Sequence, residues 1–204
     1  MDNLILLGNG GHCRSCIEII ESSKSFKIKG IIVHPSDPSK TFMNYKVLGN
    51  DDNINKFFNK NDLALICVGQ IQSPNIRINL NNLLKNNNIQ LATLKSKHSI
   101  ISNHAKIGSG SVVMHNSVIN AGAIIGENCI LNTNSLVEHD VSIGDFCHIS
   151  TGVIINGGTE IGNESFIGSG SIIKEGIKIG NRVIISAGEI VMSDIPANSI
   201  LKNK

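Results

Sequence analysis

The sequence predicts two domains: a small Rossmann-like α/β domain with a parallel sheet, then an all-β parallel β-helix shaped as a triangular prism. Three observations support this. Residues 1–97 alternate short apolar runs with segments of helical spacing. After residue 100, aliphatic residues recur at every sixth position, and Ile-Gly pairs recur every 18 residues. We therefore place the domains at residues 1–97 and 98–204.

The first domain alternates predicted strands and helices. Short apolar runs predict buried strands at "LILLG" (4–8), "KIKGIIV" (27–33), "LALICVG" (63–69) and "IQLATL" (89–94). Helical spacing predicts helices at "HCRSCIEIIESS" (12–23), "DDNINKFFN" (51–59) and "SPNIRINLNNLLKNNN" (73–88). In the last of these, Ile76, Leu80, Leu83 and Leu84 share one face. Such alternation indicates a parallel sheet with sites at the carboxyl ends of its strands.

The second domain follows a hexapeptide repeat. From Ile101 to Val191 in steps of six, all sixteen residues are Ile, Leu or Val, and the residue four positions later is small or β-branched except at Glu189. The 18-residue spacing of the Ile-Gly pairs implies three hexapeptides per coil, with coils about 4.8 Å apart. The aliphatic column then faces the prism axis, and the small residues occupy its corners.

Stacking of the coils predicts the surroundings of two histidines. His139 points outward between Ala121 one coil below and Gly157 one coil above, so it lies beside a shallow notch. An imidazole with a carboxylate on its far nitrogen suits a general base, and Asp140 is adjacent. Neighbours on a flat strand point to opposite faces, so the acid would have to act through a corner bend or through backbone geometry. The alternative is an ordinary surface histidine on a solenoid.

His148 also points outward, on the next face of the prism, between Ile130 and Phe166 one coil below and one coil above. An exposed side chain without a role is the alternative interpretation there. His12 follows a Gly-Gly turn at a helix N-terminus, where backbone N–H groups suit a phosphate or carboxylate. A plain structural turn is the alternative.

Composition and motifs exclude several classes. The net charge of +2, without a Lys/Arg run, argues against nucleic-acid binding. The apolar runs are shorter than the ~20 residues of a membrane span, and no signal peptide is evident, so a cytoplasmic protein is expected. The turn "G-N-G-G-H" lacks the third glycine of a dinucleotide fingerprint. No three histidines converge on a metal site.

The cysteines are predicted to be reduced and packed in the interior. Cys13 and Cys16 form a C-x-x-C motif, which favours packing of a helix on its strand over a redox role or half a zinc site. Cys129 and Cys147 fall at inward corner positions one coil apart. None of these thiols is expected to act as the nucleophile.

Taken together, these motifs resemble a known family. The "I-G-x-x-[SACTV]-x" ladder, the "G-N-G-G-H" turn, "LALICVGQIQSPNIR", "EHD" and "DFCHIS" are similar to the NeuD/PglD-like branch of the left-handed β-helix acyltransferases. The resemblance implies a left-handed prism, acetyl-CoA as co-substrate without a metal, and a homotrimer with the coenzyme between neighbouring copies. It also implies a small-molecule sugar or nucleotide-sugar substrate and direct acetyl transfer.

The resemblance assigns site residues by position. The catalytic base falls on His139 and its supporting acid on Asp140. The substrate-binding positions fall on Gly10, Gly11, His12 and Gly69. The acetyl-CoA positions fall on His148, Ser169 and Ala187.

The function that this resemblance implies is N-acetylation of a bacterial amino sugar, of the UDP-linked 4-amino-4,6-dideoxy-GlcNAc type, for surface glycan biosynthesis. Two alternatives stay open: O-acetylation of a sialic- or legionaminic-acid-type sugar, and a non-catalytic scaffold that binds a sugar nucleotide. The chain departs from the family pattern at two places. His34 and Pro35 stand where relatives often carry an acidic pair that contacts the nucleotide, and the C-terminal segment that helps to cover the coenzyme is shortened.

Overall fold

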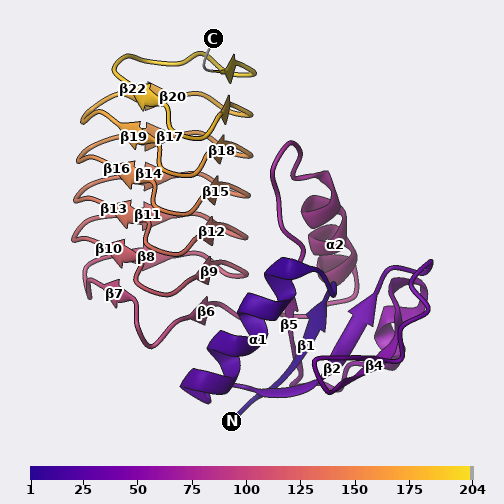
Figure 1. Cartoon of the computed structure of the whole chain (residues 1–204). Helices are drawn as coiled ribbons and strands as arrows, with labels where there is room; N and C mark the ends of the chain where they lie inside the picture. Colours follow the sequence, from indigo (N-terminus) through magenta and orange to yellow (C-terminus); the bar gives the residue numbers. More distant parts are fainter. Residues whose placement is uncertain (203–204) are drawn as a thin grey trace. The chain divides into compact units, whose positions relative to one another are not determined.

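The computed structural model describes residues 1–202 and divides the chain into two compact units. The first unit contains Met1–Gly69 and Asn75–Leu94, and the second contains Gln70–Pro74 and the chain from Lys95 onward. Both units are seen in Figure 1. Segment Gln70–Pro74 therefore interrupts the first unit and belongs to the second, and no local sequence signal predicts this.

The first unit is built on a five-stranded sheet. Its strands, in the order β3-β4-β2-β1-β5, are β3 (Thr41–Phe42), β4 (Tyr45–Asn50), β2 (Lys27–Val33), β1 (Asn3–Leu7) and β5 (Leu63–Ile66). All neighbours are parallel except β3 and β4, so the sheet is mixed rather than purely parallel. The exception is a hairpin whose two turn residues, Met43 and Asn44, have φ of 46° and 66°. Two consecutive positive φ values are typical of a type I′ hairpin turn.

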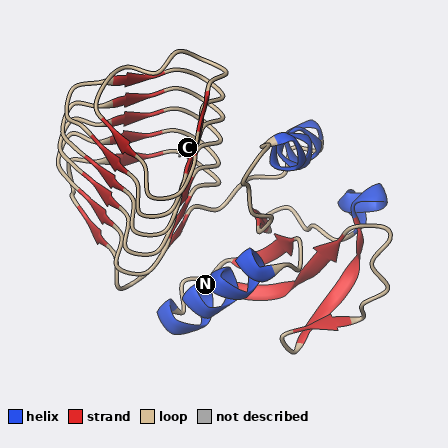
Figure 2. Cartoon of the chain, turned by 45° about the horizontal axis from the view of Figure 1, so that its top comes forward, coloured by secondary structure: helices blue, strands red, loops and turns tan. Residues whose placement is uncertain are grey.

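Helices α1 (Gly11–Ser23) and α2 (Asn75–Asn86) and the 3₁₀ helix η1 (Asp51–Lys56) complete this unit (Figure 2). Helix α1 buries the face that its spacing predicts, including Cys16, Ile17 and Ile20. Helix α2 does so only in part: Leu84 is buried and Leu80 and Leu83 pack against the core, but Ile76 is 62% exposed. The helix also buries the polar residues Arg77 and Asn81.

The cause of this difference is a buried guanidinium. Nη1 of Arg77 donates to the carbonyl oxygens of Ile66 and Val68, at 3.0 and 2.6 Å. These carbonyls lie at the end of β5, where they leave the sheet, and buried carbonyls need a partner. These bonds account for the burial of Arg77, which the apolar pattern of the sequence could not reveal.

The second unit is a left-handed parallel β-helix with three flat faces, as predicted. The first face contains β7 (Ile100–Ile101), β10 (Val118–Ile119), β13 (Leu136–Val137), β16 (Ile154–Ile155), β19 (Ile172–Ile173) and β22 (Ile190–Val191). The second face contains β8 (Lys106–Ile107), β11 (Ile124–Ile125), β14 (Ser142–Ile143), β17 (Glu160–Ile161) and β20 (Lys178–Ile179). The third face contains β6 (Leu94–Lys95), β9 (Val112–Val113), β12 (Ile130–Leu131), β15 (His148–Ile149), β18 (Phe166–Ile167), β21 (Ile184–Ile185) and β23 (Ile200–Leu201).

The register of these strands confirms the predicted coil length. Ile119 pairs with Val137, and Ile149 pairs with Ile167, each a step of 18 residues. Only the last coil is shorter, because Ile185 pairs with Leu201, a step of 16. The aliphatic column forms one continuous core in which every member from Val113 onward is buried. Among residues 1–202, no helix combines the length and apolarity needed to cross a membrane.

Candidate active site

The predicted substrate-binding residues lie together in the first unit. A cavity of about 500 Å³ is lined by Gly10, Gly11, His12 and Gly69, together with Asn9 and His34. These residues follow β1, β2 and β5 or begin α1, and the carboxyl ends of parallel strands meet at one edge of a sheet. The N-terminus of α1 opens onto the cavity, with open space at the Cβ positions of Gly10 and Gly11.

The walls of this cavity are largely apolar, with a few polar groups at its edge. Ile76 is one of the apolar lining residues, so its exposed side chain forms part of the cavity wall. Nδ2 of Asn9 donates to Asp37 at 2.8 Å, and this bond, with those from Ser39, lowers the pKa of the Asp37 carboxyl. Backbone N–H groups at a helix N-terminus beside an apolar wall suit a ligand that joins a ring to an anionic group.

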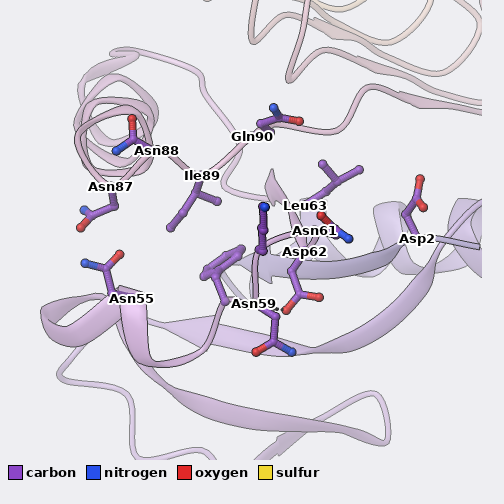
Figure 3. Close-up of a pocket in the computed structure, with 12 residues that line it drawn as sticks. Asp2, Asn55, Asn59, Asn61, Asp62, Leu63, Asn87, Asn88, Ile89 and Gln90 are labelled. Carbon is purple, nitrogen blue, oxygen red and sulfur yellow. Dashed lines mark hydrogen bonds between the residues drawn. The ribbon is translucent and has the colours of Figure 1, made fainter.

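A second cavity, of about 560 Å³, lies by the amino ends of β1 and β5 and is shown in Figure 3. Amide side chains such as Asn55 and Asn87 dominate its lining. Its buried carboxylate, Asp62, is already saturated by Lys29, Asn3 and the N–H of Asn59. It contains none of the predicted site residues, so the carboxyl end is the better candidate.

His139 and Asp140 lie in the turn between β13 and β14, at the corner of the first and second faces. Asp140 has φ of 59°, and this left-handed bend brings its Oδ2 to 3.0 Å from Nδ1 of His139. The predicted corner bend is therefore present, and the two side chains meet although they are adjacent in sequence. Both are largely exposed in the single chain, at 66% and 71%.

Two glycines, one on the coil below and one on the coil above, leave space for the side chains of His139 and Asp140. A Cβ added at Gly157 would lie 2.7 Å from Nε2 and Cε1 of His139, and one added at Gly122 would lie 2.3 Å from Oδ1 of Asp140. We call the space beside Gly157 the notch. Since Nδ1 faces Asp140, Nε2 is the ring nitrogen that faces the notch.

His148 lies on the third face but is covered. Its side chain points away from the prism axis, as expected, yet the residue is only 7% exposed. Nδ1 contacts the carbonyl oxygen of Gln70, Nε2 lies 3.2 Å from Nδ2 of Asn132, and Phe166 packs edge-on at 5.2 Å. Nε2 of Gln70 also donates to the carbonyl of Phe146 at 2.8 Å. His148 thus holds segment Gln70–Pro74 on the prism, across 78 residues of sequence.

Ser169 and Ala187 lie elsewhere on the prism. They are exposed and stacked one coil apart at the corner between the third and first faces, where Oγ of Ser169 is 2.8 Å from Oγ of Ser150. The first face separates this corner from His139. A single chain therefore brings Ser169 and Ala187 together but does not place them beside His139.

The described part of the chain has no set of side chains arranged to bind a metal ion. Residues 1–202 contain no group of three or more His, Cys, Asp or Glu side chains arranged to hold an ion. All five cysteines are free and buried. On the prism, the exposed imidazole of His139 with its carboxylate partner Asp140 is the candidate for proton transfer.

Comparisons with known proteins match both units. Residues 3–82 match the PglD N-terminal domain, and residues 98–133, 122–157 and 158–188 match the bacterial transferase hexapeptide, a model of six repeats. A comparison with curated proteins gave no match.

Solved structures match nearly the whole chain. The acetyltransferase domain of PglB from Neisseria gonorrhoeae, in complex with acetyl coenzyme A, is 28% identical with a TM-score of 0.87, covering 95% of this chain and 92% of its own. PerB from Caulobacter crescentus, in complex with CoA and GDP-perosamine, is 23% identical with a TM-score of 0.89, covering 98% and 93%. WeeI from Acinetobacter baumannii is 20% identical with a TM-score of 0.87, covering 99% and 97%.

These matches identify the chain as a hexapeptide-repeat protein with a PglD-type N-terminal domain. The two matched domains and the similar solved structures support a PglD/NeuD-like hexapeptide acetyltransferase, as the sequence motifs indicate.

Proposed function

We propose that this protein is an acetyl-CoA-dependent sugar acetyltransferase that acetylates the amino group of a nucleotide-linked amino sugar, with His139 as general base. The observation that carries the proposal is the His139–Asp140 pair, held over Gly157 on a hexapeptide prism. The similar structures support the two substrates: the Neisseria domain is in complex with acetyl coenzyme A, and the Caulobacter protein with CoA and GDP-perosamine.

The cavity of the first unit is the proposed site for the nucleotide sugar. Gly10 and Gly11 leave the N-terminus of α1 open to an anionic group, and His12 and Gly69 complete that side of the cavity. The apolar walls suit a base or sugar ring. A UDP-linked 4-amino sugar is the predicted substrate, and a GDP-linked one is the comparison suggested by the Caulobacter structure.

The chemistry follows from the orientation of His139. With the Nδ1 proton donated to Asp140, Nε2 accepts a proton from the sugar amine as its nitrogen attacks the thioester carbonyl. The C–N bond forms and a tetrahedral intermediate develops. The C–S bond then breaks, and CoA leaves as a thiolate that takes the proton from the imidazolium. Asp140 holds the tautomer and stabilises the imidazolium.

The proposed coenzyme positions are His148, Ser169 and Ala187. Ser169 and Ala187 offer an exposed, narrow corner along which an extended pantetheine arm could lie. The two nitrogens of His148 contact Gln70 and Asn132 within the chain, so we assign it the positioning of segment Gln70–Pro74 on the third face of the prism.

A homotrimer would bring these corners together. The outward positions of the first face are all aliphatic: Ile100, Val118, Leu136, Ile154, Ile172 and Ile190. On the second face the same positions are mostly polar: Lys106, Ile124, Ser142, Glu160 and Lys178. An aliphatic strip along six coils is typical of an interface between copies. Packing of this face around a threefold axis would set the His139 corner of one copy against the Ser169 corner of the next.

The deciding assay is release of the free CoA thiol from acetyl-CoA with a panel of acceptors. We expect release with a UDP- or GDP-linked 4-amino sugar, and mass spectrometry should locate the acetyl group on nitrogen. Release with sialic-acid-type sugars alone would establish the O-acetyltransferase. Binding of a nucleotide sugar without any CoA release would establish the scaffold.

The oligomer has its own test. Sedimentation at assay concentrations should give three times the mass of one chain, and Ile172→Lys on the first face should dissociate it. Lys178→Ile on the second face is the matched control and should leave the mass unchanged. A wild-type mass equal to one chain would exclude the shared site.

A further inference from the structure

Three cysteines of the first unit form a cluster that the proposed reaction does not use. Cys13 and Cys16 lie in the first turns of α1, Cys67 directly follows β5, and each is fully buried. The Cys67 thiol lies close enough to the thiols of Cys13 and Cys16 for the three to influence one another's ionisation. We call these residues the thiol cluster. The C-x-x-C motif thus supplies two of the three thiols in this cluster.

The thiol cluster lies at the cavity. Cys67 is one of the residues that line the cavity, next to His12. Nε2 of His12 is 3.7 Å from Sγ of Cys16. A small molecule that enters the cavity therefore reaches the wall behind which the thiols lie.

The three thiols are not equivalent. The hydrogen bond from Cys67 lowers the pKa of Cys16 well below its usual value, and the nearby His12 and Arg77 act in the same direction against burial. Burial raises the pKa of Cys67, and its contacts with Cys13 and Cys16 raise it further. Cys16, whose thiol contacts the His12 imidazole, is thus the candidate for the attacking thiolate, and Cys67 at the cavity wall is the candidate for the resolving thiol.

The prism supplies an internal comparison. Cys129 and Cys147 are also buried partners one coil apart, and their thiols donate to the carbonyls of Gly144 and Gly162 at 3.0 and 3.1 Å. Burial, and then the contact with Cys129, raises the pKa of Cys147. Neither residue lines the cavity or contacts an imidazole in the way that Cys16 contacts His12. Both pairs are therefore buried with neighbouring thiols, but only the Cys16–Cys67 pair lies beside a cavity and a histidine.

We propose that Cys16 and Cys67 are an oxidisable thiol pair in the wall of the cavity, which a hydroperoxide converts into a disulfide. The Cys16 thiolate attacks the terminal oxygen of the hydroperoxide; an S–O bond forms, the O–O bond breaks, and the alkoxide leaves as an alcohol after taking a proton. Cys67 then attacks the sulfur of the Cys16 sulfenic acid. The S–S bond forms, and hydroxide leaves as water with the proton of Cys67. Two thiols and one hydroperoxide give one disulfide, one alcohol and one water.

The test uses the full-length protein, tert-butyl hydroperoxide and peptide mapping. Trypsin separates the three thiols, since cleavage after Arg14, Lys24, Lys60 and Arg77 places them on different peptides. Glu138 lies between Cys129 and Cys147, so cleavage after glutamate separates the control pair. We expect a disulfide between peptides 15–24 and 61–77 that forms at least about tenfold faster than any link between Cys129 and Cys147. Dithiothreitol should reverse it.

Variants separate the roles within the cluster. Cys13→Ser should keep the Cys16–Cys67 link, Cys16→Ser should abolish fast oxidation, and His12→Gln should slow it. Equal oxidation rates for the two pairs would overturn the proposal, because contact and burial alone would then explain them. So would a wild-type link of Cys67 to Cys13, or a bound metal released from the cluster by a chelator. This inference does not depend on the proposed acetyl transfer, so either can fail alone.

Discussion

In the prism, the neighbours of a side chain are the residues 18 positions before and after it, whereas in the α/β unit they come from segments with no fixed spacing. His139 lies below Gly157 for the first reason. Gly69 and His12 share a cavity for the second, because the ends of parallel strands meet at one edge. A site on the prism can thus be located from the 18-residue spacing of its coils, whereas a site in the α/β unit can be located only from the topology of its sheet.

The largest effect is expected at the prism corner. His139→Ala should lower kcat by roughly 10²- to 10⁴-fold, the usual contribution of a general base. The melting temperature should stay unchanged, because this side chain is 66% exposed and contributes little to the core. CoA release and thermal unfolding measure the two effects, with His104→Ala as the control at an exposed histidine of the same prism. Near-normal turnover would show that another group removes the proton.

The repeat predicts a sharp contrast within one strand. In β11, Ile125 belongs to the core at 2% exposure, whereas the adjacent Ile124 is 50% exposed on the second face. Ile125→Ala should reduce the free energy of unfolding by about 2–5 kcal/mol. Ile124→Ala should cost less than about 1 kcal/mol, since a half-exposed side chain leaves no closed cavity. Chemical denaturation measures both, and equal losses would contradict the inward and outward alternation.

A contact that joins distant parts of the second unit should have a local effect. His148→Ala removes the partner of the Gln70 carbonyl and the ring beside Phe166, at a cost of about 1–3 kcal/mol for the buried group left unpaired. Hydrogen exchange should accelerate in segment Gln70–Pro74 more than in the prism core. Unchanged exchange there would mean that His148 does not hold the segment. A raised KM for acetyl-CoA would connect the segment to the coenzyme.

The smallest effect is expected at Asp140. Asp140→Asn should lower kcat by about tenfold or less, because an exposed ion pair is worth about 0–1 kcal/mol. Asparagine tolerates the left-handed conformation at φ of 59°, so the corner should keep its shape. Parallel kinetics of Asp140→Asn and His139→Ala give the comparison. A loss as large as that of His139→Ala would mean that the carboxylate is shielded from water in the working enzyme.

The sequence predicts the prism far better than the α/β unit, for physical reasons. The aliphatic column and the 18-residue spacing determine which residues are buried and which stack, so the surroundings of His139 follow directly. The burial of Arg77 in α2 and the exposure of Ile76 do not, although Leu80, Leu83 and Leu84 of the predicted face do pack on the core. The cover over His148 could not be predicted either, because no local signal links it to Gln70.

The most direct test of the central claim uses two neighbouring glycines of the prism. Gly157→Ala leaves the backbone unstrained but puts a methyl group 2.7 Å from the His139 imidazole, which must turn away from the notch. Gly158 has φ of 66° and open space at its Cβ position, so Gly158→Ala strains only the backbone, by about 1 kcal/mol. If acetyl transfer occurs in the notch, Gly157→Ala lowers kcat for CoA release by about 10- to 100-fold at an unchanged melting temperature. Gly158→Ala should lower the melting temperature and leave kcat unchanged. Wild-type kcat in Gly157→Ala would contradict the account and place the chemistry away from His139.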